Sequence, residues 1–238
     1  MKFTNIISYY VEPKGNTVGQ DSFLLYSDSS GIHLSYGIIR DKNRLPDVNS
    51  TVTIPTESDE VCFDAALFMD HGLAIVDCAK KGGKIFSTYT NHWYIMDLTT
   101  HTLKKKVQND IYIDFQTITR RKLMKFSHPE AGGFTYMLRS YFSDGVDKDH
   151  SDNTYMELFM VPVEDPTDIQ PLSILDRSIL NLKALRIMDA EIYLDDIFLL
   201  DYDTGLVRLD ILQSQRIAIT GWYRDRGFEK FGIYSDDY

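Results

Sequence analysis

Residues 66–77 read ALFMDHGLAIVD, and residues 197–210 read IFLLDYDTGLVRLD. In both stretches an apolar strand runs into an acidic turn, a glycine follows, and a second apolar strand closes on aspartate. Aspartate accepts backbone N–H bonds in turns and glycine adopts positive φ at little cost, so each stretch predicts a β-hairpin. A unit that recurs along a chain also predicts repeated architecture. The residues assigned to this structural turn pattern are Asp70, Gly72, Asp77, Asp201, Gly205 and Asp210.

The rest of the chain has the same β character. Runs of about five to nine residues rich in Ile, Leu, Val, Tyr and Phe alternate with clusters of Gly, Asp, Ser, Asn and Pro. Residues 191–200 are predicted as one strand, and residues 136–142 are predicted to pair with residues 155–161. Helical periodicity is nearly absent, although residues 171–185 could hold a helical turn or two. We therefore predict a single all-β domain over residues 1–238.

The glycines suggest a period for the repeat. Gly31 and Gly72 lie 41 residues apart, and Gly72 and Gly205 lie 133 residues apart, close to three further periods of about 44. Repeats of roughly 40 to 50 residues with four strands each are typical of propeller blades, whose sheets bury their faces against one another. At this period 238 residues hold about four to five blades, fewer than a closed ring of six or seven.

Two of these segments resemble a known family. MDHGLAIVD at residues 69–77 and the LD and GLVRLD pieces within residues 200–210 are similar to the LVIVD-type repeat of β-propellers, and residues 23–34 match it loosely. The resemblance covers about a quarter of the chain and implies a propeller that serves as a binding surface. Three forms of the propeller-like stack stay open: a small ring of large blades, an incomplete fragment, or an open stack completed by a partner. A β-sandwich is the alternative fold.

Charge and hydropathy exclude some classes of function. The chain carries 35 acidic and 25 basic side chains, a formal net charge of -10, so we expect no binding to nucleic acid. No window reaches the roughly 20 apolar residues of a membrane helix, and the N-terminus lacks an apolar secretion core. We expect an acidic, soluble protein without membrane insertion, and the cytoplasm is the slightly favoured compartment.

The two cysteines, Cys62 and Cys78, lack the CxxC spacing of zinc and redox sites. We expect reduced, buried thiols, and a single bridge is sterically possible if the two strands are neighbours.

The motifs of common enzymes are missing from the sequence: it has no GxSxG, no HExxH, no glycine-rich phosphate loop and no CxxC pair. No catalytic or cofactor-binding residue is therefore assigned. The acidic stretch DGVDKDHSDN at residues 144–153 offers oxygen donors, with Asp147, Asp149 and Asp152 as weak calcium candidates. This stretch departs from an EF-hand loop, and a solvated acidic loop is its alternative interpretation.

Aromatic doublets are the remaining candidates for binding. In Trp93-Tyr94 and Trp222-Tyr223 one ring faces each side of a strand, so the outward ring could bind a sugar or a peptide, while packing between blades is the alternative. The predicted function is a non-catalytic scaffold that binds a protein partner through its loops. The alternative is a glycan-active or metal-dependent hydrolase at the propeller axis, with carboxylates drawn from Asp64, Asp70, Glu191, Asp195 and Asp196.

Overall fold

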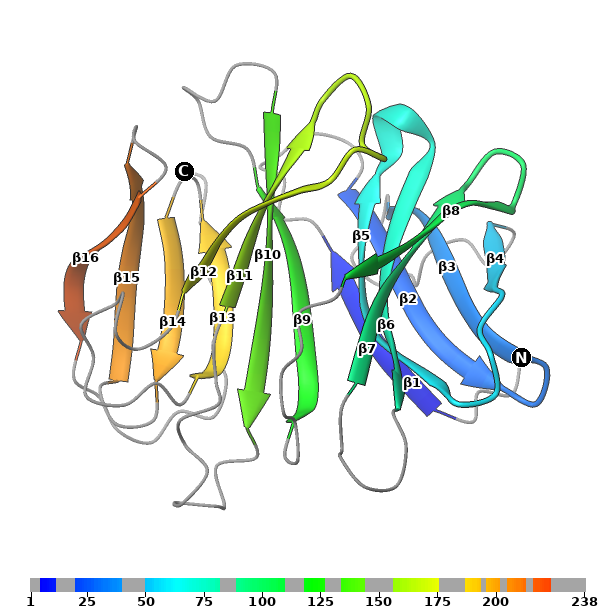
Figure 1. Ribbon diagram of the computed structural model, residues 1–238, viewed down its shortest axis with the longest axis horizontal. Coiled ribbons are helices and arrows are strands. Elements are labelled where there is room, and N and C mark those ends of the chain that lie inside the picture. Colours follow the sequence, from blue (N-terminus) through cyan, green and yellow to red (C-terminus); the bar gives the residue numbers. More distant parts are fainter. Residues whose placement is uncertain are drawn as a thin grey trace. The chain divides into compact units, whose positions relative to one another are not determined.

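The computed structural model describes residues 5–11, 20–39, 50–81, 89–109, 118–126, 134–143, 156–175, 187–193, 196–201, 205–212 and 216–223. Over these residues the chain is all-β: sixteen strands form four antiparallel sheets of four strands each, with one short 3₁₀ turn (Figure 1). None of the described segments contains a helix with the length and apolar character needed to cross a membrane. The strands fall into two compact units, β1–β8 and β9–β16.

The first unit holds two sheets, which we call A and B. Sheet A contains β1 (Asn5–Val11), β2 (Gln20–Asp28), β3 (Gly31–Ile39) and β4 (Thr51–Ile54). Sheet B contains β5 (Glu60–Phe68), β6 (Leu73–Lys81), β7 (Tyr89–Asp97) and β8 (Thr102–Asn109), with the 3₁₀ turn η1 (Met69–His71) between β5 and β6. In both sheets the strands are hydrogen-bonded in chain order, so each sheet is a meander.

The second unit holds sheets C and D, which are meanders of the same kind. Sheet C contains β9 (Ile118–Phe126), β10 (Phe134–Ser143), β11 (Met156–Pro162) and β12 (Gln170–Leu175). Sheet D contains β13 (Ile187–Tyr193), β14 (Asp196–Asp201), β15 (Gly205–Leu212) and β16 (Arg216–Tyr223).

Two sequence predictions about the second unit are corrected by this topology, and one is confirmed. The predicted single strand at 191–200 is two antiparallel strands, since β13 ends at Tyr193 and pairs there with Asp196 of β14. The first part of the stretch expected to hold helical turns is strand β12, paired with β11. The predicted pairing of 136–142 with 155–161 is confirmed, with Tyr136 opposite Met160.

Turn chemistry explains several of the hairpins. Between β2 and β3, the Asp28 carboxylate accepts the Ser30 N–H at 2.7 Å, and Gly31 takes φ 139°. Between β7 and β8, Asp97 accepts the N–H groups of Thr99 and Thr100. In these turns an aspartate side-chain oxygen thus accepts backbone N–H groups that have no partner on a neighbouring strand.

The quoted repeat plays a different structural role from the one predicted. Gly72 takes φ 60° after η1, as expected, but the exposed Asp70 carboxylate accepts no hydrogen bond among the described residues. Gly205 pairs with Asp201 across the β14–β15 turn. Asp77 lies inside β6 and Asp210 inside β15, because both strands continue past the aspartate expected to close them.

The spacing of the sheets also differs from the predicted period. Their first strands begin at residues 5, 60, 118 and 187, which gives steps of 55, 58 and 69 residues. Gly31 and Gly205 begin the third strands of their sheets, whereas Gly72 lies just before the second strand of its sheet. Glycine turns occur at several places in a meander, so the 41-residue interval joins two non-equivalent turns.

Sheets A and B share a core. Leu25, Leu34 and Val52 of sheet A and Val76 and Met96 of sheet B belong to one buried cluster. Two polar contacts also join the sheets: the Ser8 hydroxyl donates to Asp64 Oδ1 at 2.6 Å, and the Tyr36 hydroxyl donates to the Leu98 carbonyl at 2.5 Å. The first strands β1 and β5 are in contact, and in the second unit β13 contacts β9 and β10.

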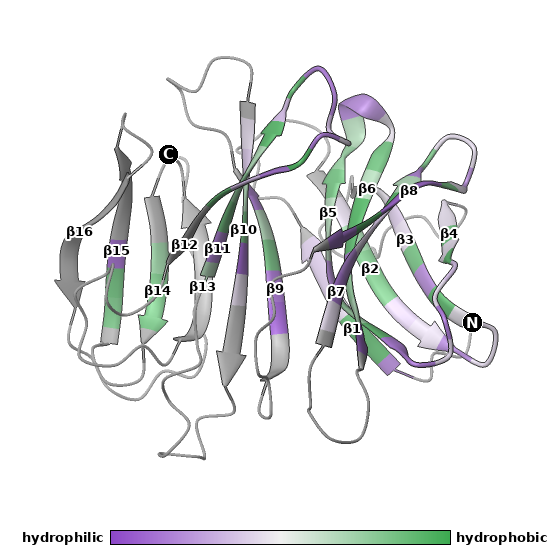
Figure 2. Cartoon of the chain, in the orientation of Figure 1, coloured by the Kyte–Doolittle hydropathy of each residue, from purple (hydrophilic) through white to green (hydrophobic). Residues whose placement is uncertain are grey.

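The central strands are buried on both of their faces. Every residue from 73 to 79 in β6 is at most 2% exposed, and residues 91–96 of β7 and 136–140 of β10 are also buried. Successive residues of a strand point to opposite faces, so an unbroken buried run requires cover on both sides of the sheet. Figure 2 shows the apolar runs in β5 and β6 and the contrasting hydrophilic β8.

Candidate functional site

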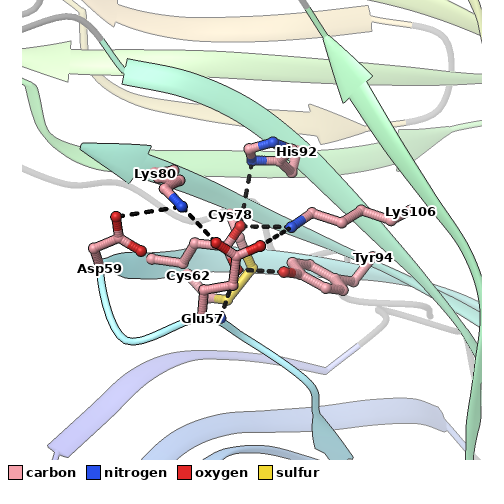
Figure 3. Close-up of polar contacts among 9 residues, drawn as sticks. Glu57, Asp59, Cys62, Cys78, Lys80, His92, Tyr94 and Lys106 are labelled. Atoms are coloured by element: carbon pink, nitrogen blue, oxygen red, sulfur yellow. Dashed lines mark hydrogen bonds and ion pairs between the residues drawn. A yellow bond between two sulfur atoms is a disulfide. The ribbon is translucent and has the colours of Figure 1, made fainter. Parts of the chain in front are cut away.

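A cluster of charged and polar side chains lies at one end of sheet B (Figure 3). Glu60 begins β5, Lys80 lies near the end of β6, and Tyr94 and Lys106 are register partners on β7 and β8. The register places Glu60 opposite Lys80 at this end of the sheet. Tyr94 and Lys106 lie level with Val76, further along their strands, and their long side chains reach back to Glu60. We call this group the Glu60 cluster, and its members are Glu57, Asp59, Glu60, Lys80, His92, Tyr94 and Lys106.

Glu60 is the centre of the cluster, and its side chain is fully buried. Its carboxylate accepts hydrogen bonds from the Tyr94 hydroxyl, from Lys106 Nζ at 2.7 Å and from the Glu57 N–H at 2.9 Å. Burial opposes the charged form of Glu60, but the bonds from Lys106 and Tyr94 outweigh it and lower the pKa of this carboxyl. Glu60 is therefore a buried, charged carboxylate whose donors compensate for lost hydration.

Tyr94 and Lys106 respond to the same surroundings. Burial, followed by the hydrogen bond to Glu60, raises the pKa of the Tyr94 hydroxyl. Burial alone would lower the pKa of Lys106, but its bonds to Glu60 and Tyr94 outweigh burial and raise that pKa. Lys106 Nζ also lies 4.9 Å from the centre of the Tyr94 ring. Both groups keep their protons at neutral pH, so they act as hydrogen-bond donors and not as bases.

The outer part of the cluster is exposed to solvent. Lys80 contacts Glu57 and lies 3.4 Å from Asp59 Oδ2, and Lys106 lies 3.4 Å from Glu57 Oε1. Exposed ion pairs of this kind contribute about 0 to 1 kcal/mol each to stability. These exposed side chains therefore cover the Glu60 carboxylate and contribute little to the stability of the fold.

His92 is the unusual member of the cluster. The residue is only 7% exposed, and its Nδ1 lies 3.6 Å from Glu60 Oε1 without a hydrogen-bond partner among the described residues. Burial, and then the charge on Lys106, lower the pKa of its imidazole. His92 is therefore neutral at pH 7, and a buried ring nitrogen is left without a partner, which is uncommon in folded proteins.

A disulfide between Cys62 and Cys78 lies next to the Glu60 cluster. The two cysteines are directly opposite each other on β5 and β6, with Cα atoms 3.9 Å apart. The expected pair of reduced thiols is therefore bridged in the structure, because the two strands are neighbours. In β7, His92 is the register partner of Cys78, so Cys62, Cys78 and His92 form one row across three adjacent strands.

A second polar group lies on the other face of sheet B. Asp64 and Asp77 are register partners, the Trp93 Nε1–H donates to Asp77 Oδ1 at 3.1 Å, and the Ser8 hydroxyl donates to Asp64. All four residues are buried or half-buried, and Asp77 and Trp93 are almost fully enclosed. This group ties strands together and presents no open carboxylate to a substrate.

Sheet C buries a charged pair between two strands, β10 and β11, whose other residues are mainly apolar. Arg139 Nε donates to Glu157 Oε2 at 2.6 Å, and the two side chains are 0% and 1% exposed. They are register partners on β10 and β11, and the Arg139 guanidinium lies 5.3 Å from the centre of the Phe159 ring. Such a pair is costly to bury and more costly to break.

The residues predicted from sequence are distributed differently from these clusters. Trp93 and Tyr94 are both buried, so neither ring of this doublet forms an outward platform. Trp222, Tyr223, Asp201 and Asp210 are described only by their backbone positions in β14, β15 and β16, and the calcium candidates Asp147, Asp149 and Asp152 lie outside the described residues. Among the described residues, no group of three or more His, Cys, Asp or Glu side chains is arranged to hold a metal ion.

Sequence reasoning missed Glu60, His92 and Lys106. They carry no local motif, since Lys106 is 46 positions from Glu60 and His92 is 32 positions from it. Only the register of four strands brings them together, and a register of that length is not readable from one sequence.

No protein-family model matches this sequence, and a search of curated proteins finds no match.

Proposed function

We propose that the chain is a non-catalytic, β-propeller-like scaffold that binds a protein partner. The architectural part of this proposal is supported by the four meanders and by the burial of β6, β7 and β10 on both faces. In a two-layer sandwich each sheet keeps one face toward solvent, so alternate residues would be exposed. Blades stacked on one another cover both faces, and the contact between β1 and β5 is the contact that neighbouring blades make.

The binding part of the proposal rests on one observation: exposed apolar side chains are concentrated on the first strands. Of the six large apolar side chains that are exposed in the described segments, four lie on β1 and β5, and Tyr9 is 74% exposed. The four are Ile6, Tyr9, Tyr10 and Val61. Exposed aromatic and aliphatic side chains gathered in one place mark protein contact surfaces more often than scattered ones do.

An irregularity in β1 strengthens this surface. The register places Ile6 opposite Tyr26 and Tyr9 opposite Leu24, with a shift between Ile6 and Ser8. Three residues apart in a regular strand, Ile6 and Tyr9 would face opposite sides of the sheet. The bulge moves them to the same side, so the strand presents two apolar side chains together. We call this pair the β1 surface.

A comparison of variants tests the proposal. Wild-type chain, Tyr9→Ser and the control Leu103→Ser are tagged, cross-linked to proteins of the source extract and analysed by quantitative mass spectrometry. Leu103 on β8 is also an exposed apolar residue, so its substitution removes a similar surface elsewhere. A partner recovered by wild type and by Leu103→Ser should fall about tenfold with Tyr9→Ser. Equal recovery by all three, or a stable monomer that recovers no partner, would contradict the proposal.

The hydrolase alternative has a single point in its favour, the adjacency of Asp64 and Asp77. Paired carboxylates at short range are what glycoside hydrolysis uses. These two are buried, however, and their oxygens already accept bonds from Ser8 and Trp93. We therefore favour the scaffold.

A further inference from the structure

We propose that reduction of the Cys62–Cys78 bridge opens a zinc site made of the two cysteine thiolates, the His92 imidazole and the Glu60 carboxylate. This site is separate from the β1 surface and does not depend on the proposed scaffold function.

The strand register places all four ligands together. Cys62, Cys78 and His92 are consecutive partners across β5, β6 and β7, so their side chains point to the same face of sheet B. Glu60 precedes Cys62 by two residues in the same strand and therefore shares that face. The sequence lacks a CxxC pair because these ligands are neighbours across strands and not along the chain.

The spacing of His92 and Glu60 fits a shared metal ion better than a hydrogen bond. Their Nδ1 and Oε1 atoms are 3.6 Å apart, which is beyond the length of an N–H···O bond. Nitrogen and oxygen ligands bonded to tetrahedral zinc at ~2.0 to 2.2 Å lie about 3.4 Å from each other. Within the described segments the enclosed Nδ1 has no hydrogen-bond partner, and a zinc ion between the two atoms would bind its lone pair.

The surroundings of Glu60 hold one oxygen ready for a metal. Oε2 accepts the Tyr94 hydroxyl and the Glu57 N–H, which fixes the plane of the carboxylate. Oε1 lies 3.6 Å from His92 Nδ1 and accepts one hydrogen bond within the described part of the chain, from Lys106 Nζ at 2.7 Å, which leaves its second lone pair for a metal ion. Partners that orient a metal ligand in this way are typical of zinc sites.

Charge and ligand type favour zinc. Two thiolates, one carboxylate, one neutral imidazole and Zn²⁺ leave a single negative charge, and the Lys106 ammonium lies beside it. Two sulfur ligands and a nitrogen ligand select zinc over calcium or magnesium, which prefer oxygen.

Opening the site requires a two-electron reduction by a dithiol. The dithiol breaks the S–S bond by thiol–disulfide exchange, becomes a disulfide itself and leaves Cys62 and Cys78 as thiols carrying two protons. Zinc binding then releases both of these protons, since thiolates are the ligands. In the bridged form both sulfurs are bonded to each other, which agrees with the absence of a metal-ready group among the described residues.

Cobalt titration of the full chain tests this site. The protein is reduced with dithiothreitol, desalted without oxygen and titrated with Co²⁺, which reports thiolate ligands through a charge-transfer band and tetrahedral geometry through strong visible bands. We expect one equivalent of Co²⁺ per chain, displacement by Zn²⁺, and no charge-transfer band from the oxidised protein. A reduced, folded protein that gives no charge-transfer band would overturn the proposal.

Matched histidine variants identify the ligand set. His92→Asn should weaken Co²⁺ binding at least tenfold and alter the visible bands, while His33→Asn should change neither. His33 is the fitting control because it is also 7% exposed and occupies the third strand of its sheet. Glu60→Gln provides a second ligand test that leaves both thiols intact. Circular dichroism confirms that each variant is folded. If His92→Asn and Glu60→Gln bind as His33→Asn does, the metal is held by thiols alone and the assigned site is wrong.

Discussion

The Arg139–Glu157 pair of sheet C should be strongly destabilised by changing one partner and tolerant of changing both. Arg139→Met leaves the Glu157 carboxylate, 1% exposed, without the guanidinium that donates to it at 2.6 Å. Removing one partner of a buried ion pair costs about 3 to 5 kcal/mol, because the remaining charge is left in a medium of low polarity. Glu157→Leu should cost a similar amount for the same reason.

The double variant Arg139→Met/Glu157→Leu decides between a charge effect and a shape effect. Apolar residues of similar volume need no compensation for lost hydration, so the free energy of unfolding should return close to that of the wild type. Urea unfolding followed by circular dichroism gives the three values, and hydrogen exchange of β10 and β11 peptides locates the change. The reasoning is refuted if a single variant loses less than about 1 kcal/mol, or if the double variant loses as much as the two singles together.

Three further predictions concern the first unit. Tyr36→Phe removes the hydroxyl that donates to the Leu98 carbonyl between sheets A and B. Thermal unfolding should show a loss of about 1 to 3 kcal/mol in the free energy of unfolding, whereas Tyr9→Phe, at an exposed position, should show almost none. Gly72→Ala forces φ 60° on a residue with a Cβ, and that Cβ would lie 3.0 Å from Thr99 Oγ1. Urea unfolding should therefore show a loss of more than about 1 kcal/mol in the free energy of unfolding, and an unchanged midpoint would contradict this. Hydrogen bonds from the Ser30 hydroxyl, then from the Ser30 N–H and from His33, lower the pKa of Asp28 to about 2. The excess in free energy of unfolding of wild type over Asp28→Asn should therefore be constant above about pH 4 and vanish as the pH falls through about 2. A difference that grows toward acid pH would refute this.

Hairpins were predictable from the sequence where turn chemistry is local. The Asp28 carboxylate and Gly31 lie in the turn that they shape, so a few neighbouring residues determine this hairpin. The repeated sequence pattern places Asp77 at the end of a strand, whereas in the structure it lies inside β6. Its hydrogen-bond donor, the Trp93 indole, is sixteen positions away in the sequence, so the bond that offsets the burial of Asp77 could not be predicted from one sequence.

The Glu60 cluster was not predictable for a related reason. Its members share a location only after four strands have paired in one register, and a shift by one residue would send His92 to the opposite face. The spacing of the sheets was misjudged because glycine turns of the same chemistry occur at two places in the meander.

Meander connectivity has a consequence for how the protein is made. Each of the sixteen described strands pairs only with the strand before it or after it in its sheet, so hydrogen bonding within a sheet does not wait for distant sequence. Proteins rich in such near-neighbour pairing fold faster than those with long-range pairing. The core between sheets A and B needs Met96 and Leu98, however, so apolar surface on sheet A stays uncovered on the ribosome until sheet B is synthesised. A translational pause before β7 should therefore lengthen the interval in which the nascent chain can aggregate, while a pause after β8 should not.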